Sequence, residues 1–171
     1  MKEADRAIKI AGGLLIFAHD ADSGAEIEFT WQEFEESVRD ALDYAGYRIE
    51  FRKVFKSDGR KHEVDVIARK FDLCMLIDAK RYGKSRYRTS SLKSEAKKHF
   101  NRCRAFENTF KCSVIPVLVS WIDDSLVFQE GCFIVPFEKL QDFVNNVEFY
   151  TDSMEDIDQL VDLENYVFDN Q

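Results

Sequence analysis

Residues 62–68 read HEVDVIA and residues 74–82 read CMLIDAKRY, and these two neighbouring stretches decide the fold. Both are rich in the apolar residues typical of β-strands, yet each carries an aspartate. Because alternate side chains of a strand share a face, Asp78 and Lys80 should project together, roughly 7 Å apart along the chain. Buried charges are costly unless they are paired or bind a metal. We therefore expect two adjacent strands to deliver Asp65, Asp78 and Lys80 to one place.

These residues alone leave two interpretations open. In the first, Asp78 and Lys80 form an ordinary ion pair where a strand reaches solvent, as many Asp-x-Lys sequences do. In the second, the two aspartates bind Mg²⁺ and the site hydrolyses phosphodiesters, because a divalent cation offsets charge on phosphate oxygens. The presence of two such strands at this spacing favours the second interpretation.

The order of these residues resembles that of the PD-(D/E)XK nuclease superfamily and, within it, archaeal Holliday junction resolvases and Mrr-type restriction endonucleases. The resemblance covers about residues 30–121. It implies a catalytic set with an acidic residue on a first helix, an Asp on the second strand, and an Asp or Glu two before a Lys on the third. Asp65, Asp78 and Lys80 match the last three. The sequence departs from the pattern where Val64 replaces the usual Pro and where the shorter Asp replaces the commoner Glu.

The first helix can be read without any family. Thr30-Trp31-Gln32-Glu33 forms a capping box and Gly46 is a natural stop, so a helix is predicted from about Trp31 to Ala45. One face of this helix is apolar. The members of that stripe are Trp31, Phe34, Val38, Ala41, Leu42 and Ala45.

Glu35 lies on the apolar stripe, whereas Glu36 lies on the polar face. Glu35 is therefore expected to point inward. The alternative is that it sits at the edge of the stripe with its carboxylate in water. Glu35 also stands three before Val38 and eleven before the pair Gly46-Tyr47, as the helical Glu of the resembled family does. This agreement selects Glu35 as the fourth catalytic residue.

The resemblance implies a metal-dependent mechanism. Asp65, Asp78 and the carbonyl of Ala79 would bind Mg²⁺ together with several waters, and Mn²⁺ is expected to substitute. Glu35 would complete the site through a water or by holding a second metal. Lys80 would orient the attacking water, or deprotonate it if its pKa were lowered.

Charge is distributed unevenly along the chain, whose net charge is −8. Residues 80–104 contain ten Lys and Arg against one Glu, a net +9, whereas residues 123–171 contain thirteen acids against one Lys, a net −12. Local charge guides a polyanion, so DNA is the predicted partner, although a charge run is often only a solvated face. An alternative DNA path would cross Arg52, Lys53, Lys56, Arg60 and Lys61. The favoured contacts are Arg81, Tyr82, Lys84, Arg86, Tyr87, Arg88, Lys93 and Lys97.

The remaining pattern predicts an α/β fold with a restriction-endonuclease-like core: a helix, a three-strand meander, a helix and a strand, with a mixed central sheet flanked by helices. An N-terminal hairpin is expected to pair 14–18 with 26–29. The other predicted elements are a strand at 47–56, a turn at 57–59, a helix with the apolar stripe Leu92, Ala96, Phe100, Cys103, Phe106 and Phe110, strands at 114–121 and 132–135, a helix at 137–147, and an acidic amphipathic helix within 151–171.

Length and composition bound the remaining possibilities. The 171 residues, 45% hydrophobic, suit one nuclease-like domain over 1–150, to which 151–171 adds either a part of the same domain or a dimer contact. No signal peptide or membrane-spanning run is recognised, so a cytoplasmic protein is expected. The resemblance also implies a homodimer. The four cysteines are expected to fill the core, no zinc ligand set is recognised, and His62 lies either near the substrate or simply at the surface.

These expectations favour a Mg²⁺-dependent DNA endonuclease, either structure-specific or restriction-type. The first alternative is a catalytically silent nucleic-acid-binding module that keeps the nuclease fold. The second is a structural interaction protein that uses the acidic helix as its interface and leaves the Asp-x-Lys cluster without a role.

Overall fold

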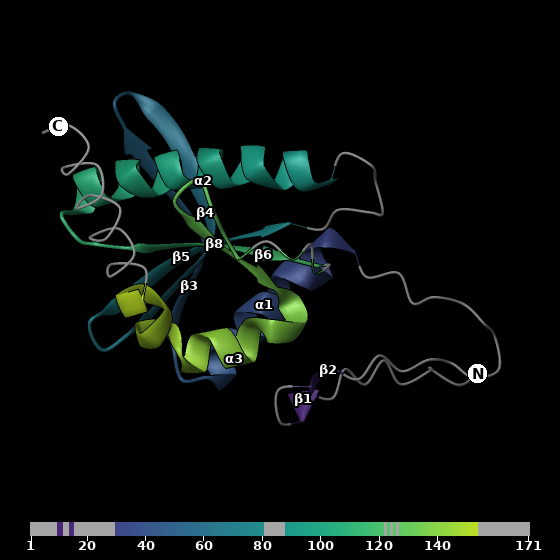
Figure 1. Ribbon diagram of the computed structural model, residues 1–171. Helices are drawn as coiled ribbons and strands as arrows, with labels where there is room; N and C mark the ends of the chain where they lie inside the picture. Colours follow the sequence, from purple (N-terminus) through teal and green to yellow (C-terminus); the bar gives the residue numbers. More distant parts are fainter. Residues whose placement is uncertain are drawn as a thin grey trace, which may run out of the picture.

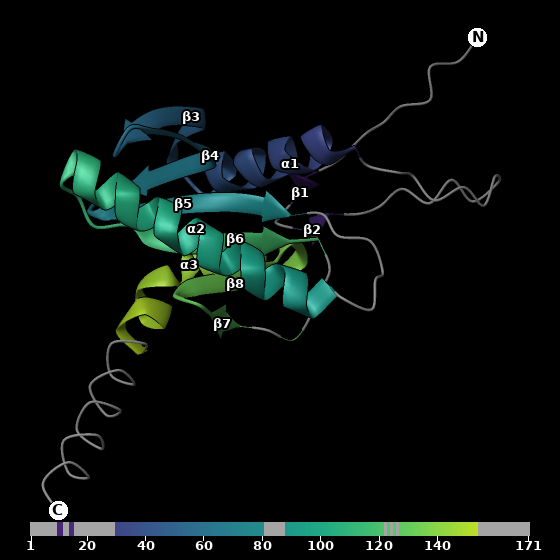
Figure 2. The ribbon, with the colours of Figure 1, turned by 90° about the horizontal axis from the view of Figure 1, so that it is seen from above.

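A six-stranded mixed sheet forms the centre of the molecule, as the computed structural model shows (Figure 1). The structure describes residues 10–11, 14–15, 30–80, 88–121, 123, 125 and 127–153. Helices α1 (Trp31–Tyr44) and α3 (Leu140–Asn145) cover one face of the sheet, and α2 (Arg88–Phe110) covers the other (Figures 1 and 2). This arrangement confirms the α/β fold with a mixed sheet flanked by helices.

The sheet combines an antiparallel meander with a parallel crossover. Its strand order is β3-β4-β5-β6-β8-β7, in which β3, β4 and β5 are antiparallel, β5, β6 and β8 are parallel, and β7 is an antiparallel edge strand. Helix α2 connects β5 to β6, because parallel neighbours need a crossover. The strands are β3 (Arg48–Ser57), β4 (Arg60–Lys70), β5 (Leu73–Lys80), β6 (Ile115–Ser120), β7 (Phe128–Gln129) and β8 (Cys132–Pro136).

The meander was predicted because Ser57-Asp58-Gly59 has the composition of a tight turn. Asp58 and Gly59 both have positive φ, 48° and 73°, as a two-residue hairpin turn requires. This turn sets the register in which Ser57 faces Arg60 and Phe51 faces Val66.

Helix α1 begins and ends where the sequence predicted. The Thr30 hydroxyl accepts from Glu33 N at 3.2 Å and the Glu33 carboxylate accepts from Thr30 N at 2.6 Å, which completes the capping box. Gly46, with φ of 82°, ends the helix. Trp31 was wrongly predicted to be buried: it is 47% exposed because it occupies the first position of the helix, beyond the packed turns.

The predicted apolar stripe of α2 is buried over most of its length. Leu92, Ala96, Cys103 and Phe106 are buried under the sheet, and Phe100 is half-buried. Phe110 is 45% exposed at the last position of the helix, although its ring still lies 4.4 Å from that of Phe106. The predicted burial of this stripe is therefore confirmed except at Phe110.

The helix predicted at 137–147 is divided into shorter pieces. A 3₁₀ turn, Phe137–Lys139, follows Pro136 and leads into α3, and the chain bends at Asn146 before residues 147–153 become helical again. Pro136 explains the start, because its fixed φ suits an extended residue before a helical turn. The rest of the predicted acidic helix, 154–171, lies outside the described residues.

The N-terminal hairpin differs from its prediction. The described strands are β1 (Ile10–Ala11) and β2 (Leu14–Leu15), which pair antiparallel with Ile10 opposite Leu15. Leu14 and Leu15 thus pair with a strand on their N-terminal side, which was not predicted. The predicted partner strand at 26–29 lies outside the described residues.

Apolar side chains fill both sides of the sheet. The larger cluster lies under α1 and α3, around Phe34, Met75 and Ile77, and two smaller clusters lie under α2. Cys74, Cys103 and Cys132 are buried free thiols and Cys112 is half-buried, so the cysteines fill the core as expected. Within the described part of the chain, no helix has the length and hydrophobicity needed to cross a membrane.

Candidate active site

The two predicted aspartates meet on adjacent strands. The antiparallel register of β4 and β5 pairs Val66 with Ile77, so Asp65 stands opposite Asp78 one residue further along. Asp65 Oδ2 accepts a hydrogen bond of 2.9 Å from Ala79 N, which ties the first aspartate to the Asp-x-Lys segment. Both carboxylates are buried. The structure thus brings together the residues that the spacing of the two strands singled out.

Two cations neutralise Asp78. Lys80 Nζ lies 2.9 Å from Asp78 Oδ2, and Arg102 Nη1 of α2 donates to Asp78 Oδ1 at 3.1 Å. Among the described residues no other group is assigned to Oδ2, so the Lys80 ammonium alone offsets the charge of this buried oxygen. A ligand could therefore reach this buried oxygen only by competing with the Lys80 ammonium.

Glu35 points into the protein from α1, as predicted. Its carboxylate is almost fully buried, and Oε2 accepts from both Nη2 and Nε of Arg52, at 3.0 and 3.3 Å. The other oxygen, Oε1, is buried, and no described residue is a hydrogen-bond partner of it. A buried carboxylate oxygen left unsatisfied is costly, and such a group is commonly associated with a ligand or a functional role.

The carboxylates differ in their affinity for protons. Burial, and then the negative charge of Asp78, raise the pKa of Asp65 to about 7. Burial also acts to raise the pKa of Asp78, but His99, Lys80 and Arg102 together outweigh it and lower that pKa. The pKa of Glu35 is raised by burial, against the opposing effect of Arg52. The site thus holds an ionised Asp78 beside an Asp65 that retains a proton more readily.

Lys80 is held as an ammonium ion. Burial by itself lowers the Lys80 pKa, but the Asp78 carboxylate outweighs it, so the pKa is raised. The predicted role of Lys80 as a base needed a lowered pKa. Its raised pKa instead favours the alternative role, in which Lys80 orients water and supplies positive charge.

Sequence reasoning missed two α2 residues that support the site. His99 is fully buried, and its ring is fixed by Leu76 O, 2.9 Å from Nε2, with Arg102 Nη1 3.4 Å from Nδ1. Burial lowers the His99 pKa, partly offset by Asp78. The available signal was the spacing of His99 and Arg102, which lie three apart on one helical face beside the buried Cys103. This spacing was not recognised because both residues lie in a run of basic residues that was interpreted as a DNA-binding or solvated helix face.

Arg52 was considered only as part of an alternative DNA path, yet its guanidinium belongs to the site through Glu35. It lies in β3 with φ of 52°, a left-handed conformation that is rare for a residue within a strand. The ring of Phe51 lies 5.1 Å from the Arg52 guanidinium carbon. Position 52 is not Gly or Asn, so its left-handed backbone could not be predicted from the residue type.

The predicted DNA contacts are only partly described. Lys93 and Lys97 are exposed on α2, and Arg88 begins that helix. His62 stacks on Phe55 with ring centroids 5.0 Å apart, a packing role on the surface of the sheet. The predicted contacts outside the described residues are Arg81, Tyr82, Lys84, Arg86 and Tyr87.

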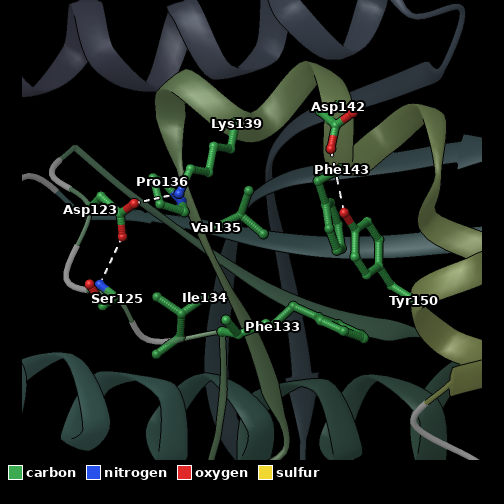
Figure 3. Close-up of a pocket in the computed structure, with 11 residues that line it drawn as sticks. Asp123, Ser125, Phe133, Ile134, Val135, Pro136, Lys139, Asp142, Phe143 and Tyr150 are labelled. Atoms are coloured by element: carbon green, nitrogen blue, oxygen red, sulfur yellow. Dashed lines mark hydrogen bonds and ion pairs between the residues drawn. The ribbon is translucent and has the colours of Figure 1, made fainter.

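A cavity of about 430 Å³ lies beside β8 and α3, and its lining does not include Glu35, Asp65 or Asp78 (Figure 3). At this cavity Lys139 forms an ion pair with Asp123, and the Tyr150 hydroxyl donates a hydrogen bond to Asp142. Phe133 and other apolar residues form much of its lining. The carboxylate cluster, with its unsatisfied buried oxygens, is the stronger candidate for chemistry.

The donor set suits a hard divalent cation. Among the described residues, no three His, Cys, Asp or Glu side chains gather as a ready-made metal cluster, so a closed zinc site is not formed there. Mg²⁺ needs less, because it is commonly held by one or two carboxylates and keeps several waters. Asp65 and Asp78 fit that requirement, and Glu35 lies near enough for its carboxylate to be influenced by the charges of Asp78 and Lys80.

Comparison with known proteins gives a family but no activity. No family model matches the chain. An uncharacterized protein of Archaeoglobus fulgidus is 45% identical over 120 residues, which cover 70% of this chain and 93% of that protein. The chain therefore belongs to the same family as this archaeal protein.

Solved structures give weaker similarities. Protein AF1548, of unknown function, matches with a TM-score of 0.40 and 14% identity over 51% of this chain, and the match spans less than half of AF1548, 46%. An XisH family protein from Nostoc punctiforme matches with a TM-score of 0.43 and 15% identity, over 50% of this chain and 68% of its own. These similarities are too low to support an argument about function.

Proposed function

We propose that the protein is a Mg²⁺-dependent DNA endonuclease that hydrolyses phosphodiester bonds. The observation that carries the proposal is the meeting of Asp65 with Asp78 and Lys80 on adjacent strands, beside a buried Glu35. Within the described residues, no hydrogen-bond partner is assigned to buried Glu35 Oε1, and buried Asp78 Oδ2 contacts only the Lys80 ammonium, at 2.9 Å. Oxygen atoms in this condition are suited to a hydrated divalent cation.

In this proposal Asp65, Asp78 and the Ala79 carbonyl hold the metal, and Glu35 completes the site. When bound, Mg²⁺ supplies positive charge to the phosphate oxygens and makes a bound water more acidic. The Ala79 N–H fixes the Asp65 carboxylate, so that its second oxygen can face the cluster. Arg102 and His99 hold Asp78 and its strand from the α2 side.

Lys80 positions the attacking water and stays protonated. Hydrolysis adds the hydroxyl of water to phosphorus and breaks one P–O ester bond, and the leaving oxygen takes up a proton from solvent. The ammonium of Lys80 lies where it would balance the negative charge that develops on the phosphate. Its raised pKa supports this role.

Residues 81–88 follow the site directly in sequence, and with Lys93 and Lys97 they would contact the DNA backbone. Mn²⁺ should substitute for Mg²⁺. A homodimer would bring two such sites to the two strands of a duplex or junction. DNA as substrate accords with the cytoplasmic location expected from the sequence.

One observation favours a catalytically silent DNA-binding module as the second candidate. Asp78 already contacts both Lys80 and Arg102, so its charge is neutralised without a metal. In a working nuclease the metal has to compete with Lys80 for Oδ2. A silent module would keep this arrangement permanently.

The deciding experiment incubates the full chain with linear duplex, single-stranded, flap and four-way-junction DNA, in Mg²⁺, Mn²⁺ or EDTA. We expect metal-dependent cleavage of at least one substrate. The variant Asp78→Ala should lose cleavage by more than about a thousandfold while it still binds DNA. Asp72→Asn, which changes an exposed aspartate in the β4–β5 turn, is the matched control and should cut normally.

Two results would count against the proposal. Binding of DNA by the wild-type protein without metal-dependent cleavage of any substrate would favour the silent module. Cleavage by Asp78→Ala at the wild-type rate would remove this residue from the mechanism.

A further inference from the structure

We propose that Arg52 is a catalytic residue that binds the phosphate under attack, with Glu35 as the group that aims it. This inference rests on the proposed nuclease activity and adds a cation that the sequence pattern does not assign to the site. Three features carry it: an unusual backbone, the contacts that hold the guanidinium, and the exposure of the Arg52 side chain.

The backbone places Arg52 at the site at an energetic cost. Arg52 falls directly opposite Asp65 in the register of β3 and β4, where the paired residues on either side are Phe51 with Val66 and Lys53 with Val64. Its φ of 52° departs from the strand at this one step. A left-handed backbone is sterically unfavourable for a residue with a side chain, and such residues cluster at functional sites.

Contacts with Glu35 and Phe51 fix the side chain. Nε and Nη2 of Arg52 both donate to Glu35 Oε2, and the ring of Phe51 lies 5.1 Å from the guanidinium carbon. A guanidinium has five N–H donors, so Nη1 and the second N–H of Nη2 remain. Within the described residues, no hydrogen bond is assigned to Nη1. The free edge is thus held in a fixed orientation.

Arg52 is the most available of the three cations at the cluster. Lys80 and Arg102 both contact Asp78 and are each 22% exposed, whereas Arg52 is 43% exposed. Asp78 and Lys80 are close enough to influence the Glu35 carboxylate electrostatically, so the Glu35–Arg52 pair borders the same site. A substrate phosphate arriving from solvent would meet the free edge of Arg52 there.

Phosphate is the ligand that this edge fits. The planar fork of a guanidinium binds two phosphate oxygens at once, which a lysine ammonium does not reproduce. During hydrolysis, negative charge on the oxygens that remain on phosphorus is stabilised by a fixed cation already aimed at them. Arg52 would hold the phosphate during attack, and Glu35 would keep the fork in place.

The test compares three single variants of the full chain: Arg52→Ala, Arg52→Lys and Arg39→Ala. Arg39 is the matched control, because its guanidinium carbon lies 5.2 Å from the same Phe51 ring, but its hydrogen bonds go to Asp40. We expect Arg52→Ala to lose about 10²- to 10³-fold in kcat, with KM changed by less than about threefold. Arg52→Lys, which keeps a charge beside Glu35 and should fold, should still lose at least about tenfold. Arg39→Ala should keep the wild-type kcat.

A binding measurement separates this inference from the proposed activity. The probe is deoxythymidine 3′,5′-bisphosphate, titrated calorimetrically in Ca²⁺ so that no turnover is needed. Weakening by at least about tenfold in Arg52→Ala, but not in Arg39→Ala, would support a phosphate contact even if no DNA substrate were cut. If the wild type cuts DNA and Arg52→Lys cuts equally fast, with unchanged bisphosphate binding, the inference about Arg52 is overturned and the nuclease proposal stands.

Discussion

Two buried carboxylates of the same cluster are held in contrasting ways. Asp78, on β5, contacts the two cations Lys80 and Arg102, and its pKa is lowered. Glu35, on α1, is paired in the described structure with the half-exposed Arg52 alone, and its pKa is raised. Burial acts in the same direction on both groups. At Asp78 the effects of His99, Lys80 and Arg102 together outweigh burial, whereas at Glu35 the effect of burial exceeds that of Arg52.

Asp65 extends the contrast, because its fixed partner is a backbone N–H. The hydrogen bond from Ala79 N lowers the Asp65 pKa, but burial and the charge of Asp78 outweigh it. The cations that contact Asp78 therefore come from β5 and α2. Among the described residues, Glu35 on α1 contacts one cation, and no ion pair is assigned to Asp65 on β4. A metal ion placed between them would supply the charge that Asp65 and Glu35 lack.

The largest expected effect comes from removing a cation from the Asp78 side. Arg102→Ala should lower the free energy of unfolding by about 2 to 3 kcal/mol, because a buried charge loses a hydrogen-bonded partner. Arg104→Ala is the matched control on the same helix. Arg104 pairs with Glu107 at 2.8 Å but is 64% exposed, so its loss should cost about 0.5 kcal/mol or less. Urea denaturation of both variants measures the difference.

Equal losses for these two variants would contradict the comparison. They would show that Lys80 alone can satisfy Asp78, and that the contrast with Glu35 does not depend on the number of cations.

The sequence predicted the parts of the site that local rules control. The capping box and the apolar stripe placed Glu35 correctly, because both act within one helix. The Asp58-Gly59 turn and the alternation of the strands placed Asp65 beside Asp78. These patterns need no knowledge of distant residues, and they account for most of the fold and for the four predicted catalytic positions.

The supporting cations could not be predicted in the same way. Arg52 is 17 residues from Glu35 and Arg102 is 24 residues from Asp78, so both contacts depend on how separate elements pack. Arg102 also belongs to a basic run that reads as a solvated helix face. Trp31 and Phe110 were predicted to be buried but are exposed. An apolar stripe does not indicate where a helix extends beyond the sheet that covers it.

The second prediction concerns pH and separates Asp65 from Asp78. The folded-state pKa of Asp65, about 7, lies above its ordinary value of 3.8, so its contribution to stability is full below pH 3.8 and is lost as pH rises through about 7. His99 acts in the opposite sense, because its lowered pKa gives stability that is lost as pH falls. In EDTA, from pH 5.5 to 8, the wild type should therefore lose about 1 to 2 kcal/mol relative to Asp65→Asn, which keeps His99.

Metal should reverse this loss, since the metal and the proton compete for Asp65. Added Mg²⁺ should raise the wild-type unfolding temperature more at pH 8 than at pH 5.5, and should have little effect on Asp65→Asn at either pH. A shift of the same size at both pH values in the wild type would mean that Mg²⁺ binds elsewhere.

The smallest effect on stability is expected for cations that serve no carboxylate of the site. Lys93 and Lys97 are exposed on α2, and no ion pair is assigned to either among the described residues. If they contact phosphates, Lys93→Gln or Lys97→Gln should each make the log–log salt dependence of duplex binding shallower by roughly 0.9, while stability changes by about 0.5 kcal/mol or less. The control is Lys111→Gln, just beyond the other end of α2 and about 27 Å along the helix axis from Lys93, which should leave the slope unchanged. Fluorescence anisotropy over a series of salt concentrations measures the slopes. A slope that is equally insensitive to all three substitutions would argue against DNA contacts by the cations of α2. The DNA path would then be sought over the β3–β4 hairpin, which carries Arg52, Lys53, Lys56, Arg60 and Lys61.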